Sequence, residues 1–129
     1  MNRYLALGAI HVKDVNLWSH VGVLEQERSF GQEFLLDFSL WLDLDRAAKK
    51  DDLSMTADYS LAIHGIQDLA SKLNCNTLEY FSELILDCLE SLYGSIPMEI
   101  YLRKCSAPVA GFSGTVGVER SRHLPSPRN

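Results

Sequence analysis

Lys104 is the residue whose position in this chain most suggests proton chemistry. It ends an apolar run that alternates from Met98 to Leu102, and it precedes a loop with Pro108 and Gly111. This pattern predicts a strand that opens into a loop, where an ammonium group lies on a pocket wall and can transfer protons. A lysine at a strand end is commonly solvated and inactive, because lysine is rarely buried. A catalytic role for Lys104 therefore depends on partner groups from other segments.

The composition describes one small acidic domain. The 129 residues are 47% apolar, which is enough for a single modest core. The formal net charge is −5, from 12 basic and 17 acidic residues without a basic cluster, which argues against a nucleic-acid partner. The sequence has no signal-peptide pattern and no apolar run of membrane-spanning length, so we expect a cytoplasmic protein without a membrane partner. Cys75, Cys88 and Cys105 are odd in number and lack CxxC spacing, which predicts reduced thiols.

Hydrophobic periodicity predicts a single α+β domain over residues 1–120 and a disordered tail over residues 121–129. Strands are expected at about 6–20, 33–44, 97–104 and 113–120, with a hairpin loop between the first two. Asp58 is expected to cap one helix, and Asn76 a second helix in which Glu79 stands at the third position. The predicted order is ββααββ, a four-stranded antiparallel sheet with two helices on one face.

Such a sheet leaves two edges unpaired, and one chain of this length cannot close it into a barrel. Association of subunits edge to edge is the simplest way to pair these edges. We therefore expect a homo-oligomer in which subunits share a barrel and ligand pockets lie between neighbouring subunits.

Four segments make the chain resemble the dihydroneopterin aldolase family of folate biosynthesis, across about residues 8–120. They are GVLEQERSFGQEF with Glu27, DDLSMTADYSLAI with Tyr59, NTLEYFSELI with Leu78 and Glu79, and YLRKCSAPVAG with Lys104. Their order, spacing and strand or helix context together identify the family. The resemblance implies the tunnelling fold, in which subunits form tetrameric barrels that usually stack into octamers, with active sites between subunits.

The resemblance also implies a reaction. Family members cleave 7,8-dihydroneopterin in a retro-aldol reaction that gives 6-hydroxymethyl-7,8-dihydropterin and glycolaldehyde. The ring imine of the substrate accepts the electrons once it is protonated, so neither a metal, a Schiff base nor a cofactor is expected. The four histidines are widely separated and form no HxH or HExxH pair, which counts against the zinc-dependent pterin synthases that share the fold.

Two residues would carry the central roles in this reaction. Lys104 matches the lysine that acts as general acid and base. Glu79 matches the glutamate that accepts two hydrogen bonds from the pterin. By position alone, Glu79 could instead be a capping-box residue that pairs with Asn76.

Four further positions match the site of the family. Tyr59 matches a tyrosine that helps to move a proton at the enol intermediate, although it could instead only pack at a helix start. Glu27 matches a loop glutamate near the lysine and the reacting side chain, although it could be a solvated carboxylate. Ala57 and Leu78 match positions whose backbone groups contact the pterin. Departures from the family pattern at Val21, Ala57 and Cys105 remove none of the catalytic groups.

Two alternatives remain open at this point. A dihydroneopterin triphosphate or dihydromonapterin epimerase would use the same proton-transfer groups, but a triphosphate favours extra basic residues, and the loop around Glu27 offers only Arg28. A non-catalytic pterin-binding ring is the second alternative. The retained set of Glu27, Tyr59, Glu79 and Lys104 argues against it.

Overall fold

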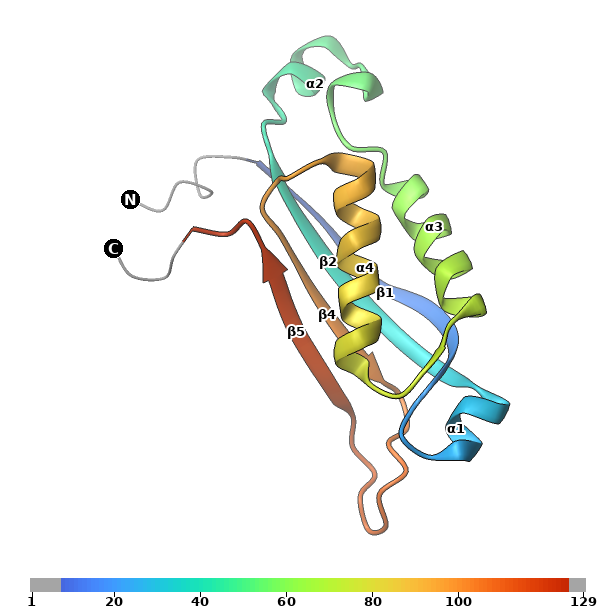
Figure 1. Cartoon of the computed structure of the whole chain (residues 1–129). Helices are drawn as coiled ribbons and strands as arrows, with labels where there is room; N and C mark the ends of the chain where they lie inside the picture. The colour runs from blue at the N-terminus through green and yellow to red at the C-terminus, as the bar shows by residue number, and fades with distance from the viewer. Residues whose placement is uncertain (1–7, 126–129) are drawn as a thin grey trace.

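A computed structural model describes residues 8–125, which form an α+β domain (Figure 1). The four long strands are β1 (Gly8–Val21), β2 (Gln32–Leu42), β4 (Met98–Lys104) and β5 (Val116–Arg122). The two long helices are α3 (Tyr59–Lys72) and α4 (Leu78–Tyr93), and both cover the same face of the sheet (Figure 1). These long elements confirm the expected fold class and the ββααββ order.

The sheet contains one more strand than expected. Its order is β3-β1-β2-β4-β5, and the four long strands are antiparallel to their neighbours. The additional strand β3 (Asn74–Cys75) lies in the connection between α3 and α4 and runs parallel to the end of β1, where Val21 pairs with Cys75. Two residues are too few to produce a periodic pattern, so hydrophobic periodicity could not reveal this strand.

The core lies between the sheet and the two long helices. Alternate residues of β2, among them Phe34 and Phe38, are fully buried against α3 and α4, and each such side chain contributes about 1.5–3 kcal/mol of burial free energy. Phe34 also meets Phe81 of α4 edge to face, with ring centroids 5.4 Å apart. The start of β2 therefore packs directly against the start of α4.

A β-bulge interrupts β1, where the sequence predicted one regular strand. The register moves from Val12 opposite Phe38 to Val15 opposite Leu36, so β1 carries one extra residue. Asp14 in the bulge has a positive φ of 59°, a conformation that aspartate tolerates better than most residues. Because of the extra residue, both Val12 and Val15 contribute to the core.

The predicted helix caps differ in outcome. Asp58 caps α3 as expected, since its carboxylate accepts a hydrogen bond from the Ser60 N–H at 3.1 Å. The expectation that Asn76 caps α4 is wrong. Thr77 has an extended backbone, and its Oγ1 accepts the Tyr80 N–H at 3.1 Å, so α4 begins one residue later than the Asn76 cap implied.

Short helices occupy two of the connections. The expected hairpin loop between the first strands contains α1 (Glu25–Phe30), and the charged stretch after β2 contains α2 (Asp45–Lys50) and the 3₁₀ helix η2 (Leu53–Met55). No helix within residues 8–125 is long and apolar enough to cross a membrane.

Strand β5 extends past the expected end of the domain at residue 120. Arg122 at its end lies 2.7 Å from Glu83 and from Asp87, and Arg120 lies 2.8 Å from Glu83, so ion pairs hold this edge strand against α4. The start of the expected tail is thus part of the sheet. Residues 6–7 of the expected first strand and residues 126–129 of the expected tail lie outside the described residues.

Candidate active site

A cavity of about 420 Å³ opens where α1, the start of α4, the end of β4 and the start of β5 meet. These elements converge at one end of the sheet (Figure 1). The volume lies within the range of about 300–1,000 Å³ that is typical of small-molecule sites. Four of the expected site residues line the cavity, namely Glu27, Leu78, Glu79 and Lys104.

Lys104 and Glu27 form a largely buried ion pair on the wall of this cavity. The Lys104 Nζ lies 2.8 Å from Glu27 Oε2, and the two side chains are only 15% and 7% exposed. Lys104 is fixed by the sheet, where it stands opposite Phe34 of β2. At this depth the attraction between the charges is screened less than at the surface, so the ammonium group is held in one orientation.

The Glu27 carboxylate is held by three donors. Oε2 accepts a hydrogen bond from Gln32 Nε2 at 2.8 Å besides that from Lys104, and Oε1 accepts the Leu24 N–H at 3.1 Å. The Glu27 carboxylate also needs a glycine at position 22, because a Cβ atom on Gly22 would lie 2.2 Å from Glu27 Cδ. A bulkier residue at position 22 would therefore displace the carboxylate.

These contacts decide the charge of Glu27. Burial by itself raises the pKa of the carboxyl, but the hydrogen bonds from Lys104, Gln32 and Leu24 and the charge of Lys104 together outweigh it, so the pKa lies below the ordinary value of 4.5. Glu27 is therefore an anion at neutral pH. It can both orient the lysine and stabilise positive charge on it.

Glu79 lines the cavity from the first turn of α4. Its side chain is exposed, and its carboxylate makes no hydrogen bond or ion pair with another residue in the described part of the chain. Because Thr77 supplies the cap, the capping-box pairing of Glu79 with Asn76 does not form. Leu78 beside it is 7% exposed and anchors this turn in the core. An unengaged carboxylate thus faces the same space as the Lys104 ammonium.

Tyr59 and Ala57 do not reach this cavity. Tyr59 begins α3, whereas Leu73, just after the end of this helix, accepts the His20 N–H near the cavity. The 14 residues of α3 at about 1.5 Å each place Tyr59 about 20 Å away. The Tyr93 hydroxyl, at the far end of α4, donates to the Asp58 carbonyl oxygen at 2.6 Å, which agrees with this placement. Tyr59 is half-exposed, and Ala57 is buried in the core.

Several cavity residues had not been assigned to the site from the sequence. They are Val23, Leu24, Asn76, Thr77, Ala107, Pro108, Val109, Val116 and Val118. Seven of them lie within five residues of Glu27, Glu79 or Lys104 in the chain, which was the available signal, whereas Val116 and Val118 belong to β5. They give the cavity a mostly apolar lining around a few charged groups, as is typical of small-molecule sites.

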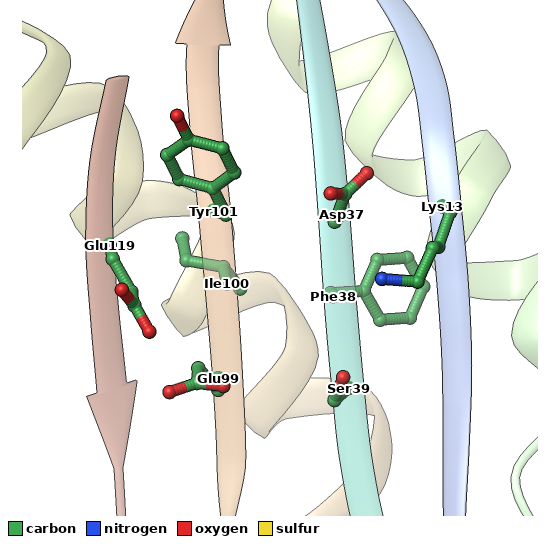
Figure 2. A pocket seen from close by; sticks show the side chains of 8 residues that line it. All are labelled: Lys13, Asp37, Phe38, Ser39, Glu99, Ile100, Tyr101 and Glu119. Atoms are coloured by element: carbon green, nitrogen blue, oxygen red, sulfur yellow. The ribbon is translucent and has the colours of Figure 1, made fainter.

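A second cavity of about 270 Å³ lies on the face of the sheet that the helices leave open (Figure 2). Glu99 of β4 and Glu119 of β5 line it from neighbouring strands, with Lys13 of β1 on the opposite side (Figure 2). Burial, followed by the hydrogen bond and the repulsion from Glu119, raises the pKa of the Glu99 carboxyl. This cavity contains none of the residues expected in the site.

Other chemistry-bearing groups are dispersed. Within residues 8–125, no group of three or more His, Cys, Asp or Glu side chains is arranged to hold a metal ion. Cys75, Cys88 and Cys105 are free thiols, as the sequence predicted, and burial raises the pKa of each.

Comparisons with known proteins identify the family of the chain. The family model described as dihydroneopterin aldolase matches residues 10–121. A protein of Synechocystis named probable dihydroneopterin aldolase is 30% identical over 118 residues, which cover 90% of this chain and all of the relative. The dihydroneopterin aldolase of Bacillus subtilis is 25% identical over 114 residues, or 88% of this chain and 95% of the relative.

The fold is also that of a solved structure. The crystal structure of Escherichia coli dihydroneopterin aldolase in complex with neopterin superposes with a TM-score of 0.82 at 22% identity, covering 90% of this chain and 99% of that one. With a family model spanning nearly all of the described residues and relatives matched along almost their full length, this chain belongs to the dihydroneopterin aldolase family of carbon–carbon lyases.

Proposed function

We propose that the cavity at the start of α4 binds the pterin ring of 7,8-dihydroneopterin and that Lys104 moves the protons of its retro-aldol cleavage. The products are 6-hydroxymethyl-7,8-dihydropterin and glycolaldehyde, and the reaction belongs to folate biosynthesis. We also propose a cytoplasmic location, which suits a biosynthetic enzyme of this family. The observation that carries the proposal is the buried Lys104–Glu27 pair, which lines one cavity together with the unengaged Glu79.

Glu79 anchors the pterin. Its two carboxylate oxygens accept hydrogen bonds from the amino group and from the adjacent ring N–H of the pterin. These two hydrogen bonds are parallel and charge-assisted. The start of α4 favours this anion, because the helix macrodipole places partial positive charge there. The backbone of Leu78 lies beside it and contributes to the same edge.

Lys104 acts on the side chain of the bound substrate. Bond cleavage needs removal of the hydroxyl proton and protonation of the carbon that remains on the ring, and one ammonium–amine couple can do both. The protonated ring imine takes up the electron pair, so the lysine need form no covalent bond with the substrate. Glu27 keeps the lysine in place throughout, at an Nζ to Oε2 distance of 2.8 Å in the free protein.

A second copy of the chain completes the site. Tyr59 and Ala57 lie about 20 Å from the cavity along α3, so within one subunit they cannot touch the same ligand. Among the described residues, β5 pairs only with β4, and β1 pairs beyond β2 only with the two residues of β3. These open edges support a homo-oligomer, a tetrameric ring or a stacked octamer, in which a neighbour brings Tyr59 and Ala57 to the Glu27–Lys104 pair.

The triphosphate epimerase alternative is disfavoured by the position of Arg28. Its Nη1 donates to the carbonyl oxygens of Gly22 and Val23 at 2.8 and 2.7 Å, and Arg28 does not line the cavity. The guanidinium group is thus engaged with the backbone. Within one subunit Lys104 is the single basic residue among those that line this cavity, and it is already paired with Glu27.

The test is turnover of 7,8-dihydroneopterin by the purified protein, with the pterin product followed by chromatography and glycolaldehyde by derivatisation. Absence of both products in an intact oligomer would refute the proposal. The shared site has its own test, in which inactive Lys104→Ala and Tyr59→Phe subunits are dissociated and reassembled together. Mixed rings should regain part of the activity, because some sites then receive both native residues. No recovery in well-formed mixed rings would refute the sharing of one site between Tyr59 and Lys104 of different subunits.

A further inference from the structure

Arg28 occupies an unusual place in the loop that carries Glu27. Helix α1 has only six residues, and the leucine at its N-cap position, Leu24, has no side-chain acceptor for the first N–H groups, so the helix has little stability of its own. Arg28 Nη1 bridges the two carbonyl oxygens of Gly22 and Val23, which precede the helix, at 2.8 and 2.7 Å. Arg28 Nη1 therefore links the loop before α1 to the helix itself.

The backbone of Arg28 is held as well. Its carbonyl oxygen, near the end of α1, accepts hydrogen bonds from Asn74 Nδ2 at 3.2 Å and is 2.9 Å from His20 Nδ1. Asn74 belongs to β3, and His20 belongs to the end of β1. Arg28 thus joins β1, the loop before α1 and the connection between the long helices.

The link from Arg28 to the reacting groups passes through a single peptide unit. The Val23 carbonyl, which accepts the Arg28 hydrogen bond, and the Leu24 N–H, which donates to Glu27 Oε1 at 3.1 Å, belong to the same planar peptide group. When Arg28 fixes the carbonyl, it also fixes the direction of the N–H on the other side of that plane. The N–H in turn holds the carboxylate that pairs with Lys104.

We propose that Arg28 is a positioning residue that orients the Glu27–Lys104 pair through the peptide group between Val23 and Leu24. For its kinetic consequence this inference rests on the proposed function, since the pair is assigned there to proton transfer. Loss of the Arg28 side chain frees the peptide plane, weakens the Leu24 N–H to Glu27 bond and lets the lysine move. A displacement of the order of 1 Å at such a pair lowers kcat by about 10- to 100-fold.

The experiment measures both the pair and the reaction. The pKa of the Glu27 carboxyl is followed by ¹³C NMR, and the pH profile of kcat is recorded for the same variants. In Arg28→Met the pKa of Glu27 should rise toward its ordinary value, because the hydrogen bond from the Leu24 N–H, one of those that lower it, is weakened. The acidic limb of the pH profile should move to higher pH in parallel. Arg28→Lys should restore most of both, since a single nitrogen makes both bonds in the native protein.

Arg28→Met also removes a positive charge, so a second variant separates charge from geometry. The other charged and titratable groups around Glu27 are Lys104 on β4, Glu79 on α4, His20 on β1 and Glu25 on its own helix. Leu24→Pro removes the N–H itself without changing any of these charges, and the φ of −78° at Leu24 suits proline. It should raise the pKa of Glu27 as Arg28→Met does. In the Leu24→Pro protein a further Arg28→Met change should then move the pKa of Glu27 very little; a full additional rise would overturn the proposal, because only the lost charge would then matter.

Arg120→Met is the matched control. Arg120 Nη1 also bridges two acceptors, Ser82 Oγ and Glu83 Oε1, but it joins β5 to α4 away from Glu27. This variant should lose stability without moving the pKa of Glu27. An Arg28→Met protein with native kcat and a native Glu27 pKa would refute the role of Arg28. If the native protein does not cleave dihydroneopterin at all, the proposed function fails, whereas the NMR measurement still decides whether Arg28 orients Glu27.

Discussion

Replacing Glu27 by glutamine tests the central feature of the site, the buried pair with Lys104. The native carboxylate accepts three hydrogen bonds, from Lys104, Gln32 and the Leu24 N–H. The amide of glutamine has a single acceptor oxygen, so its NH₂ group must face at least one of these donors. One charge-assisted hydrogen bond contributes about 1.5–3 kcal/mol, and breaking a buried ion pair costs about 3–5 kcal/mol. With side chains 7% and 15% exposed, we expect Glu27→Gln to lose about 2–4 kcal/mol of unfolding free energy at neutral pH.

The pH dependence of this loss has a definite sign. The pKa of Glu27 is lowered in the folded protein relative to 4.5, so its stabilisation is fully present above about pH 4.5. It is lost as the pH falls through the lowered folded pKa, where the native carboxyl becomes protonated and neutral like the amide. The difference in unfolding free energy between the native protein and Glu27→Gln should therefore shrink as the pH falls below about 4.5.

Urea denaturation at about pH 7 and about pH 3.5 measures this difference, at one protein concentration because assembly also stabilises subunits. Glu25→Gln is the matched control, since Glu25 is an exposed glutamate in the first turn of the same helix. It should change the unfolding free energy by less than about 0.5 kcal/mol at both pH values. A Glu27→Gln protein as stable as this control at neutral pH, or equally destabilised at both pH values, would refute the reasoning.

Three further predictions concern single side chains. Lys104→Ala should lower kcat about 10²- to 10⁴-fold with little change in the Kd of the pterin product. Borohydride added during turnover of the native protein should leave no adduct on Lys104, and a trapped adduct would indicate a Schiff base instead. Glu79→Gln should weaken binding of the pterin product by about 1.5–3 kcal/mol in calorimetry. The Tm should stay almost unchanged because Thr77 caps α4, and an unchanged affinity would remove Glu79 from the site. The raised pKa of Glu99 makes the native protein lose stability as the pH rises from about 4.5 through that pKa. The unfolding free energy of Glu99→Gln should therefore gain on the order of 0.2–1 kcal/mol relative to that of the native protein between about pH 4 and pH 7, as measured by urea denaturation. A difference that stays constant with pH would contradict this.

Much of the fold could be predicted from local patterns, because alternation and capping act between residues close in the chain. The apolar alternation of β2 predicted a strand with one buried face, and Asp58 predicted the start of α3. The motif positions Glu27, Glu79 and Lys104 were selected from the sequence as well, and they line one cavity. Their selection rested on a family resemblance, because each residue type alone fits a solvated or capping role.

The remaining features depend on contacts between distant segments, which no local pattern encodes. The bulge in β1 brings both Val12 and Val15 to the core, and Thr77 rather than Asn76 caps α4 after a connection that pairs with β1 through β3. The ionised, buried state of Glu27 results from donors that lie up to 77 residues away in the chain. The separation of Tyr59 from the cavity follows from the length and direction of α3 against the sheet. Sequence patterns therefore determined which groups are available, and the packing of helices on the sheet decided which of them one subunit can bring together, because burial and charge pairing depend on distances in three dimensions.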